Sequence, residues 1–264
     1  MENVTIISNL KNKDSRSEDI ALAKLLDKYF RTEVLDLFDD SIFSKNSFFL
    51  IRNVWGCFNG SERMLKIYHN FSRRNIYHNN RFIGMGDQKG KRYLVKLYNT
   101  KYQVVPSFNN YEKALRQDSK EYLLKPIYSG SGKGIVSVPT NHLKQYFDAK
   151  KYIIQPKIKF ASEISFFFID NNFHHALKTK GGRWDLELYF PTAEESSLAY
   201  QFVEWNPMTG IQRIDFLKTY TNKILLLEIE DWCPYLSLLD VKDFPVSNFV
   251  SVVVKSIQDS FNKN

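Results

Sequence analysis

Residues 123–138 read Leu-Leu-Lys-Pro-Ile-Tyr-Ser-Gly-Ser-Gly-Lys-Gly-Ile-Val-Ser-Val. A short apolar run that ends at Lys125 comes first, and a second apolar run closes the stretch. The loop between them carries alternating glycines at Gly130, Gly132 and Gly134. This pattern predicts a strand, a glycine-rich loop and a second strand. Backbone N–H groups in such a loop can bind phosphate oxygens, and Lys125 and Lys133 supply positive charge.

The loop differs from the P-loop, in which a glycine, four residues and then Gly-Lys-Ser/Thr open a helix. Here Ile127 stands where the first glycine belongs, and Gly134 stands where the hydroxyl residue belongs. Strand-forming residues follow the loop, whereas a P-loop is followed by a helix. Considered alone, the loop is equally compatible with an ordinary hairpin turn rich in glycine and serine.

Length and composition indicate a globular protein of two or three subdomains. The chain has 264 residues, which is enough for a sizeable core. It contains no run of about 18 apolar residues, so we expect no membrane-spanning helix. Its first residues do not resemble a signal peptide, and its two cysteines, Cys57 and Cys233, fit no metal or redox spacing. We therefore expect a reduced, cytoplasmic setting.

Charge is distributed unevenly along the chain. Residues 51–160 carry 21 basic and 6 acidic side chains, whereas residues 161–264 carry 9 basic and 14 acidic ones. A basic middle third suits a nucleic acid or a nucleotide polyphosphate equally well. The acidic last third favours metal sites over a second surface for nucleic acid.

The first 85 residues alternate between strand and helix patterns. We expect strands at 4–7, 32–37 and 48–51, with a helix between the first two whose start is marked by Ser15 and Glu18 as a capping box. Units of this size predict a small parallel sheet. A further helix is expected at 64–73, and the Asn-, Gly- and Arg-rich residues 77–89 read as a linker.

The rest of the chain predicts an α+β organisation. Helices are expected at 91–98, 111–117, 142–147, 193–202 and 246–261. Extended segments are expected at 104–107 and 152–156, a hairpin at 163–170 and 173–178, and antiparallel strands at 211–217 and 223–229.

Three carboxylates form a candidate cation site. Glu228 and Glu230 end a strongly apolar run, and residues two apart on a strand share a face. If Asp215 lies on the adjoining strand, the three side chains converge, which suits Mg²⁺ bound to phosphates. The alternative is a solvated strand end, with Glu228 paired to Lys218 or Arg213.

Other polar residues give weaker signals. His174 and His175 are adjacent, so on a strand they are expected to face opposite ways, which disfavours a metal pair and leaves at most one of them facing a site. Lys178, Lys180 and Arg183 surround a glycine pair, which indicates either a basic loop that reaches a phosphate or a solvated surface loop. We expect the aromatic residues 166–168 to lie in the core, and neither cysteine to act as a nucleophile.

These segments together resemble the ATP-grasp superfamily, and most closely its bacterial branch of glutathione-synthetase-like proteins. The similar segments keep the family's order over nearly the whole chain. They are Arg52-Asn-Val-Trp55, Lys91-Arg-Tyr-Leu94, Val104-Val-Pro-Ser107, Leu124-Lys-Pro126 with the glycine loop, Ile154-Gln-Pro156, Glu163-Ile-Ser with Phe173-His-His-Ala176, Arg213-Ile-Asp215 and Glu228-Ile-Glu230.

The resemblance implies a fold, a reaction and a set of site residues. The fold would have an N-terminal α/β domain at 1–85 and two α+β lobes at 86–154 and 155–264. Family members bind Mg²⁺ and ATP and activate a small-molecule carboxylate as an acyl phosphate, which an amine then attacks. The implied nucleotide-binding residues are Lys91, Lys125, Ser129, Gly130, Ser131, Gly132, Gly134, Gln155, Lys157, Ile158 and Glu163. Asp215, Glu228 and Glu230 would hold Mg²⁺, and Arg213, Lys178 and Arg183 would act on the transferred phosphoryl group.

Some positions depart from the family pattern. Gly56 follows Trp55 where the branch usually has an aspartate, residues 186–191 lack a glycine pair, and residues 231–234 read Asp-Trp-Cys-Pro. These positions lie where an acceptor would bind, so an unusual acceptor or a lost ligase activity is expected there. The alternatives are an ATP-grasp protein that only transfers phosphate or binds nucleotide, and a basic nucleic-acid-binding protein, which the sequence favours less. A homodimer is compatible with the sequence.

Overall fold

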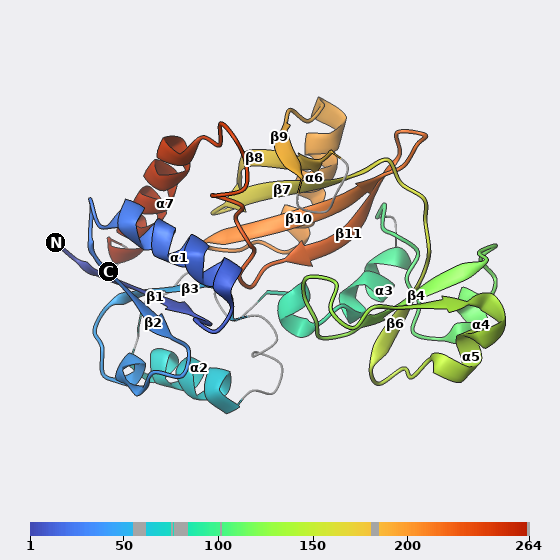
Figure 1. Ribbon diagram of the computed structural model, residues 1–264, viewed down its shortest axis with the longest axis horizontal. Coiled ribbons are helices and arrows are strands. Elements are labelled where there is room, and N and C mark those ends of the chain that lie inside the picture. Colours follow the sequence, from blue (N-terminus) through green and yellow to red (C-terminus); the bar gives the residue numbers. More distant parts are fainter. Residues whose placement is uncertain (55–61, 75, 77–83, 101, 181–184, 263–264) are drawn as a thin grey trace.

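The computed structural model describes residues 1–54, 62–74, 76, 84–100, 102–180 and 185–262. These residues form three sheets with their helices (Figure 1). Within the described part, no helix has the length and apolar character needed to cross a membrane.

The N-terminal sheet is parallel, as predicted. Its strands lie in the order β2-β1-β3 and pair in parallel register. Their bounds are β1 Asn3–Ser8, β2 Arg31–Asp36 and β3 Phe48–Ile51, and the associated helices are α1 Lys13–Leu26, the short η1 Asp40–Phe43 and α2 Glu62–Arg74. The predicted capping box is wrong, because α1 begins at Lys13 after Asn12, which places Ser15 inside the helix. Glu18 is instead fully buried.

The second sheet contains the glycine loop. Its order is β5-β4-β6, and all pairs are antiparallel. The strands are β4 Glu121–Pro126, β5 Val136–Pro139 and β6 Tyr152–Pro156, which confirms the predicted strand, loop and strand. The neighbouring helices are η2 Asp87–Lys89, α3 Arg92–Tyr98, α4 Tyr111–Ala114, η3 Thr140–His142 and α5 Leu143–Tyr146. The helix predicted at 111–117 is therefore shorter than expected.

The third sheet has five antiparallel strands in the order β11-β10-β7-β8-β9. Its elements are β7 Ser162–Ile169, β8 Asn172–Thr179, β9 Leu186–Tyr189, β10 Ile211–Lys218, β11 Ile224–Glu230 and α6 Ala193–Trp205. Strand β9 was not predicted. Along β7, Phe166 and Phe168 pack in the same core as α6, and Phe167 packs in the core on the opposite face. The prediction that these aromatics belong to the core is confirmed.

The last helix, α7 Val246–Phe261, joins the third sheet to the N-terminal region (Figure 1). One hydrophobic cluster contains Val4 of β1, Leu22 of α1, Phe167 of β7 and Phe249 of α7. The N-terminal sheet therefore shares its core with the C-terminal half of the chain.

Candidate active site

Two adjoining cavities lie in the cleft between the second and third sheets. The larger has a volume of about 470 Å³, and the smaller a volume of about 120 Å³. The residues that line both cavities are Ser129, Gly130, Glu163, Thr179 and Glu228. The glycine loop and the β11 carboxylate thus lie at the junction between the two spaces.

The larger cavity is lined by both lysine and apolar side chains. Lys91 and Lys125 line it together with Gln155, whose amide donates to Ser107 Oγ at 2.9 Å. Burial lowers the pKa of Lys125, whose side chain is almost fully enclosed. The apolar lining comes from Val105, Leu123, Ile158, Leu217 and Leu227. A flat apolar ring and a chain of anionic groups would both find complementary surfaces here.

The glycine loop folds back on itself at the entrance to both cavities. Ser129 Oγ donates to the Lys133 carbonyl at 2.8 Å, and Lys133 N–H donates to the Gly130 carbonyl at 3.1 Å. Gly134 has a φ of 74°, and a Cβ there would lie 3.1 Å from the Pro126 side chain. The turn and this close approach to the end of β4 together favour glycine at this position.

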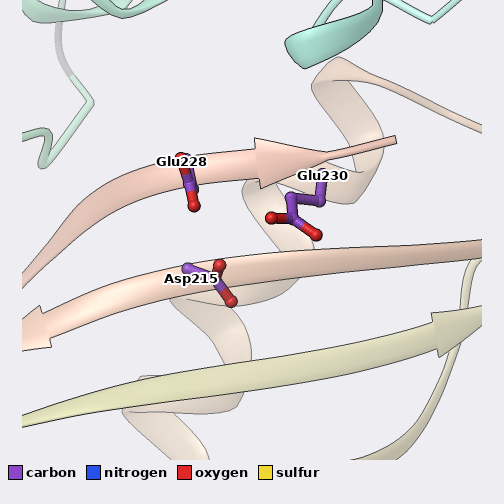
Figure 2. A group of neighbouring side chains, drawn as sticks. All are labelled: Asp215, Glu228 and Glu230. Atoms are coloured by element: carbon purple, nitrogen blue, oxygen red, sulfur yellow. The ribbon is translucent and has the colours of Figure 1, made fainter. Parts of the chain in front are cut away.

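The three predicted carboxylates converge in the smaller cavity (Figure 2), and Glu228 also lines the larger one. Asp215 on β10 lies opposite Glu228 on β11, and Glu230 follows on the same face of β11. One oxygen from each carboxylate lies within 4.8 Å of the other two. This arrangement follows from the two-residue repeat of the strands and from the pairing of β10 with β11.

Two cations balance these carboxylates. Arg213 makes two hydrogen bonds of 2.8 Å to Asp215 and lies 3.0 Å from Glu230. Lys91 Nζ lies 2.6 Å from Glu228 and 2.5 Å from Asp87. Glu228 is therefore paired in the cleft with Lys91, so the alternative of a solvated strand end paired to Lys218 or Arg213 is wrong. Lys218 instead pairs with Glu195 at 3.0 Å.

Comparison with solved structures identifies the arrangement of the elements. The sequence matches no protein-family model and no curated protein. D-cycloserine synthetase DcsG superposes with a TM-score of 0.76 at 15% identity, covering 97% of this chain and 99% of that one. The ATP-grasp ligase PsnB, in complex with the precursor peptide PsnA2 and AMPPNP, superposes with a TM-score of 0.67 at 11% identity, covering 97% of both chains. The chain has the ATP-grasp fold.

A third solved structure widens the range of functions found on this ATP-grasp fold. N5-carboxyaminoimidazole synthetase from Staphylococcus aureus superposes with a TM-score of 0.67 at 13% identity, covering 97% of this chain and 77% of that one. At such identities the likeness establishes the fold alone. The closeness to the glutathione-synthetase-like branch stays a prediction.

Charge coupling in the ATP-grasp cleft shifts several pKa values. Burial raises the pKa of Glu230, and the neighbouring Glu228 and Asp215 add to this shift. Burial also acts on Glu228, but Lys91 and Lys125 outweigh it and lower the pKa of that carboxyl. Glu228 is thus ionised, whereas Glu230 would ionise more readily if a further positive charge lay beside it.

Three predicted site residues lie elsewhere or are not described. Lys178 stands opposite Ile164 on the face of the third sheet that packs with α6, and its ammonium lies 3.1 Å from Glu187. It therefore faces away from Asp215, which does not support the predicted catalytic role. Lys157 lies 2.7 Å from Glu121 and does not line the larger cavity, although Gln155 and Ile158 do. Arg183 lies outside the described residues.

The two adjacent histidines do not face opposite ways, so that prediction is wrong. Phe167 pairs with His175 and Phe168 pairs with Phe173, so His174 is an extra residue in β8. This bulge interrupts the alternation of side chains. The His174 and His175 rings therefore approach to 2.8 Å between their Nδ1 atoms. The pair packs against Phe249 of α7, and neither ring lines the cavity that holds the carboxylates.

Sequence reasoning missed Asp87 and the residues that hold it in place. Gly86 N–H and Gln88 N–H both donate to the buried Asp231 carboxylate, at 2.7 and 2.9 Å. These contacts fix residues 84–88, part of the predicted linker, against the end of β11. The spacing of Asp87 and Lys91, four residues apart, is a pattern that favours ion pairs and could have indicated this contact.

The smaller cavity also has a wall from the segment after β11, where the resemblance placed acceptor contacts at residues 231–234 but none at 235–237. Residues 232–237 follow β11 and contribute Trp232, Cys233, Tyr235 and Ser237. The opposite wall comes from Phe167, Leu177 and Leu186 of the third sheet. The smaller cavity is therefore apolar at one end and is lined by Arg213 and the carboxylates at the other.

Proposed function

We propose that the protein is an ATP-dependent carboxylate–amine ligase that releases ADP. The observation that carries the proposal is the junction of the two cavities, where the glycine loop lies with Glu228, which belongs to the same carboxylate cluster as Asp215 and Glu230. Such a junction suits transfer of a phosphoryl group from a nucleotide in one space to an acceptor in the other. The solved ATP-grasp ligases with the same fold support the reaction class.

The larger cavity is the proposed nucleotide site. Lys125 and Lys91 would neutralise phosphate charge, and backbone N–H groups of the loop at Ser129, Gly130, Ser131, Gly132 and Gly134 would bind phosphate oxygens. Gln155, Ile158 and the other apolar residues would enclose the base, with Glu163 at the junction. The proposed nucleotide site includes the backbone of Lys157 but not the side chain of Lys157.

The carboxylate cluster fits a divalent cation. Three hard oxygen donors within 4.8 Å of one another match the ligands that Mg²⁺ takes beside phosphates. A cation bound there would neutralise charge on the phosphates. Arg213, held by Asp215 and Glu230, would stabilise charge on the phosphoryl group during transfer.

The smaller cavity is the proposed acceptor site. An acceptor carboxylate oxygen would attack the terminal phosphorus of ATP, which releases ADP and forms an acyl phosphate. An amine would then attack the acyl carbon and expel inorganic phosphate, which leaves a C–N bond. The apolar lining from Phe167, Leu177 and Trp232 favours an acceptor with an apolar body.

Calorimetric titration with ATP, with and without Mg²⁺, tests the nucleotide site. We expect saturable binding that depends on Mg²⁺ and that weakens more than about tenfold in Lys125→Ala, because a buried charge contact to phosphate is lost. Lys151→Ala removes an exposed lysine and serves as the matched control. Unchanged affinity in a folded Lys125→Ala variant would contradict the assignment.

An ADP-release screen over amino acids and small carboxylates then tests the ligase reaction. ADP release that depends on both an acceptor carboxylate and an amine is expected. ATP binding without such release would favour the alternative of a phosphotransferase or nucleotide-binding protein. Absence of ATP binding, together with nucleic-acid binding that weakens steeply with salt, would favour the nucleic-acid alternative.

A further inference from the structure

We propose that Asp87 is a positioning residue of the nucleotide site. It keeps Lys91 in place when a divalent cation binds Glu228. The inference rests on the proposed function, since it assumes that Asp215, Glu228 and Glu230 bind the cation. It assigns a role to a residue outside the carboxylate cluster.

Lys91 is shared between two anions. Its ammonium lies 2.6 Å from Glu228 and 2.5 Å from Asp87, and its side chain is only 6% exposed. A buried ammonium that loses its partner is strongly destabilising. Glu228 can therefore turn toward a cation at low cost only if Asp87 stays beside Lys91.

Asp87 is held independently of Glu228. Tyr93 Oη donates to Asp87 Oδ1 at 3.1 Å and accepts the Ile229 N–H at 2.6 Å. The N–H groups of the residues on both sides of Asp87 are fixed by the Asp231 carboxylate. A change in the position of the Glu228 side chain therefore leaves Asp87 and its contact with Lys91 in place.

This geometry makes Lys91 a competitor of the cation for Glu228. Removing the ammonium frees Glu228, so cation binding in the absence of nucleotide becomes stronger. Removing the Asp87 charge leaves Lys91 dependent on Glu228 alone, so cation binding becomes weaker. The two substitutions therefore act in opposite directions.

Binding of Mn²⁺ alone, followed by electron paramagnetic resonance without nucleotide, tests the inference. We expect Lys91→Met to bind Mn²⁺ on the order of tenfold more tightly than wild type, and Asp87→Asn on the order of tenfold more weakly. In the Lys91→Met background, Asp87→Asn should lose most of its effect, because the ammonium that Asp87 positions is gone. Lys151→Met is the matched control, with unchanged Mn²⁺ affinity expected.

The double-variant cycle separates positioning from a general charge effect. If Asp87 acted only through its negative charge, Asp87→Asn would weaken Mn²⁺ binding equally with and without Lys91, and the inference would be overturned. Absence of tighter Mn²⁺ binding in Lys91→Met, or of any binding at millimolar Mn²⁺ in all variants, would also overturn it. If Lys91→Met does not fold, Lys91→Gln replaces it with the same expected directions.

Failure of this inference is distinguishable from failure of the proposed function. If ATP titration shows the Lys125-dependent site but the Mn²⁺ cycle is additive, only the role of Asp87 is lost. If ATP does not bind, the proposed function fails, whatever the Mn²⁺ measurements give.

Discussion

His175 occupies an environment that opposes its protonation. Its ring stacks on Phe167 at 4.3 Å between centroids and meets Phe244 edge-on at 4.8 Å. Burial, together with the neighbouring His174, lowers the pKa of His175 to about 3. The folded protein therefore contains a neutral imidazole where an unfolded chain would hold one that titrates near its ordinary value.

This shift predicts a loss of stability in acid. Because the pKa of His175 is lower in the folded state than in the unfolded state, its contribution is complete above about pH 6.5 and is lost as the pH falls toward 3. From pH 7.5 to 5.5 the expected loss is about 1.4 kcal/mol. His175→Phe should reduce the acid sensitivity by that amount, as measured by urea unfolding at both pH values. An equal pH dependence in both proteins would contradict this assignment.

For individual residues, the sequence predicts the side-chain directions that follow from local periodicity. Glu228 and Glu230 share a face because β11 is regular from Glu228 to Glu230, and the alternation predicted this. His174 and His175 share a site because of a bulge in β8, which arises from its pairing with β7. Such a bulge depends on contacts between strands and has no sign in the local sequence.

Among the elements, the segment after β11 is the least regular and is fixed by buried charges. Glu18 of α1 accepts hydrogen bonds from Leu236 N–H and Leu238 N–H, at 3.1 and 3.2 Å. Arg52, after β3, donates to the Pro234 carbonyl at 2.6 Å and pairs with Glu18 and Asp19. The wall of the proposed acceptor site is therefore positioned by α1 and by Arg52.

Removing the charge of Glu18 should loosen this wall. Glu18→Gln places an amide donor beside Arg52 and weakens the two backbone hydrogen bonds, so we expect a loss of about 3 kcal/mol in the free energy of unfolding. Amide hydrogen exchange at Leu236 and Leu238 should accelerate more than exchange in β11. Glu62→Gln, which breaks an exposed pair with Lys66, is the control and should change stability little. Unaltered exchange at both leucines would contradict the anchoring role.

Elements with a local sequence pattern could be predicted, whereas elements that depend on pairing or on distant contacts could not. The hairpin of β7 and β8 and the strands β10 and β11 were predicted, since their apolar segments are separated by polar turns at 171–172 and 221–222. Strand β9 is a short edge strand whose pairing with β8 determines it, and the prediction missed it. Residues 232–237 have no periodicity, so local pattern does not predict their place beside the carboxylates, and only the resemblance placed residues 231–234 near an acceptor.

The whole molecule is held together by a core that crosses the expected domain boundaries. Phe249 of α7 is fully buried in a cluster that also contains residues of β1, α1 and the third sheet. The second sheet has its own cluster around Tyr122 and Ile154, but a division at residue 154 would cut its strand β6. A division at residue 85 separates the N-terminal sheet from the elements of the C-terminal half that cover one of its sides.

This shared core predicts joint unfolding of the N-terminal and third sheets. Phe249→Ala should lower the free energy of unfolding by about 4 kcal/mol, because a large buried ring is removed. Hydrogen exchange should show equal loss of protection in β1 and β7. Tyr146→Ala removes an exposed aromatic and is the control. Loss of protection in β7 alone would show that the N-terminal sheet is stable by itself.

The run of residues 228–238 has a consequence for how the protein can evolve. It contains two of the carboxylates, the Asp231 anchor for residues 84–88, one wall of the smaller cavity and the contacts to Glu18 and Arg52. A substitution here alters several properties at once, so its tolerance to mutation should be low. Leu177 and Leu186, on the opposite wall of the smaller cavity, take part in fewer of these contacts. New acceptor preferences should therefore arise, in nature or in directed evolution, through that wall.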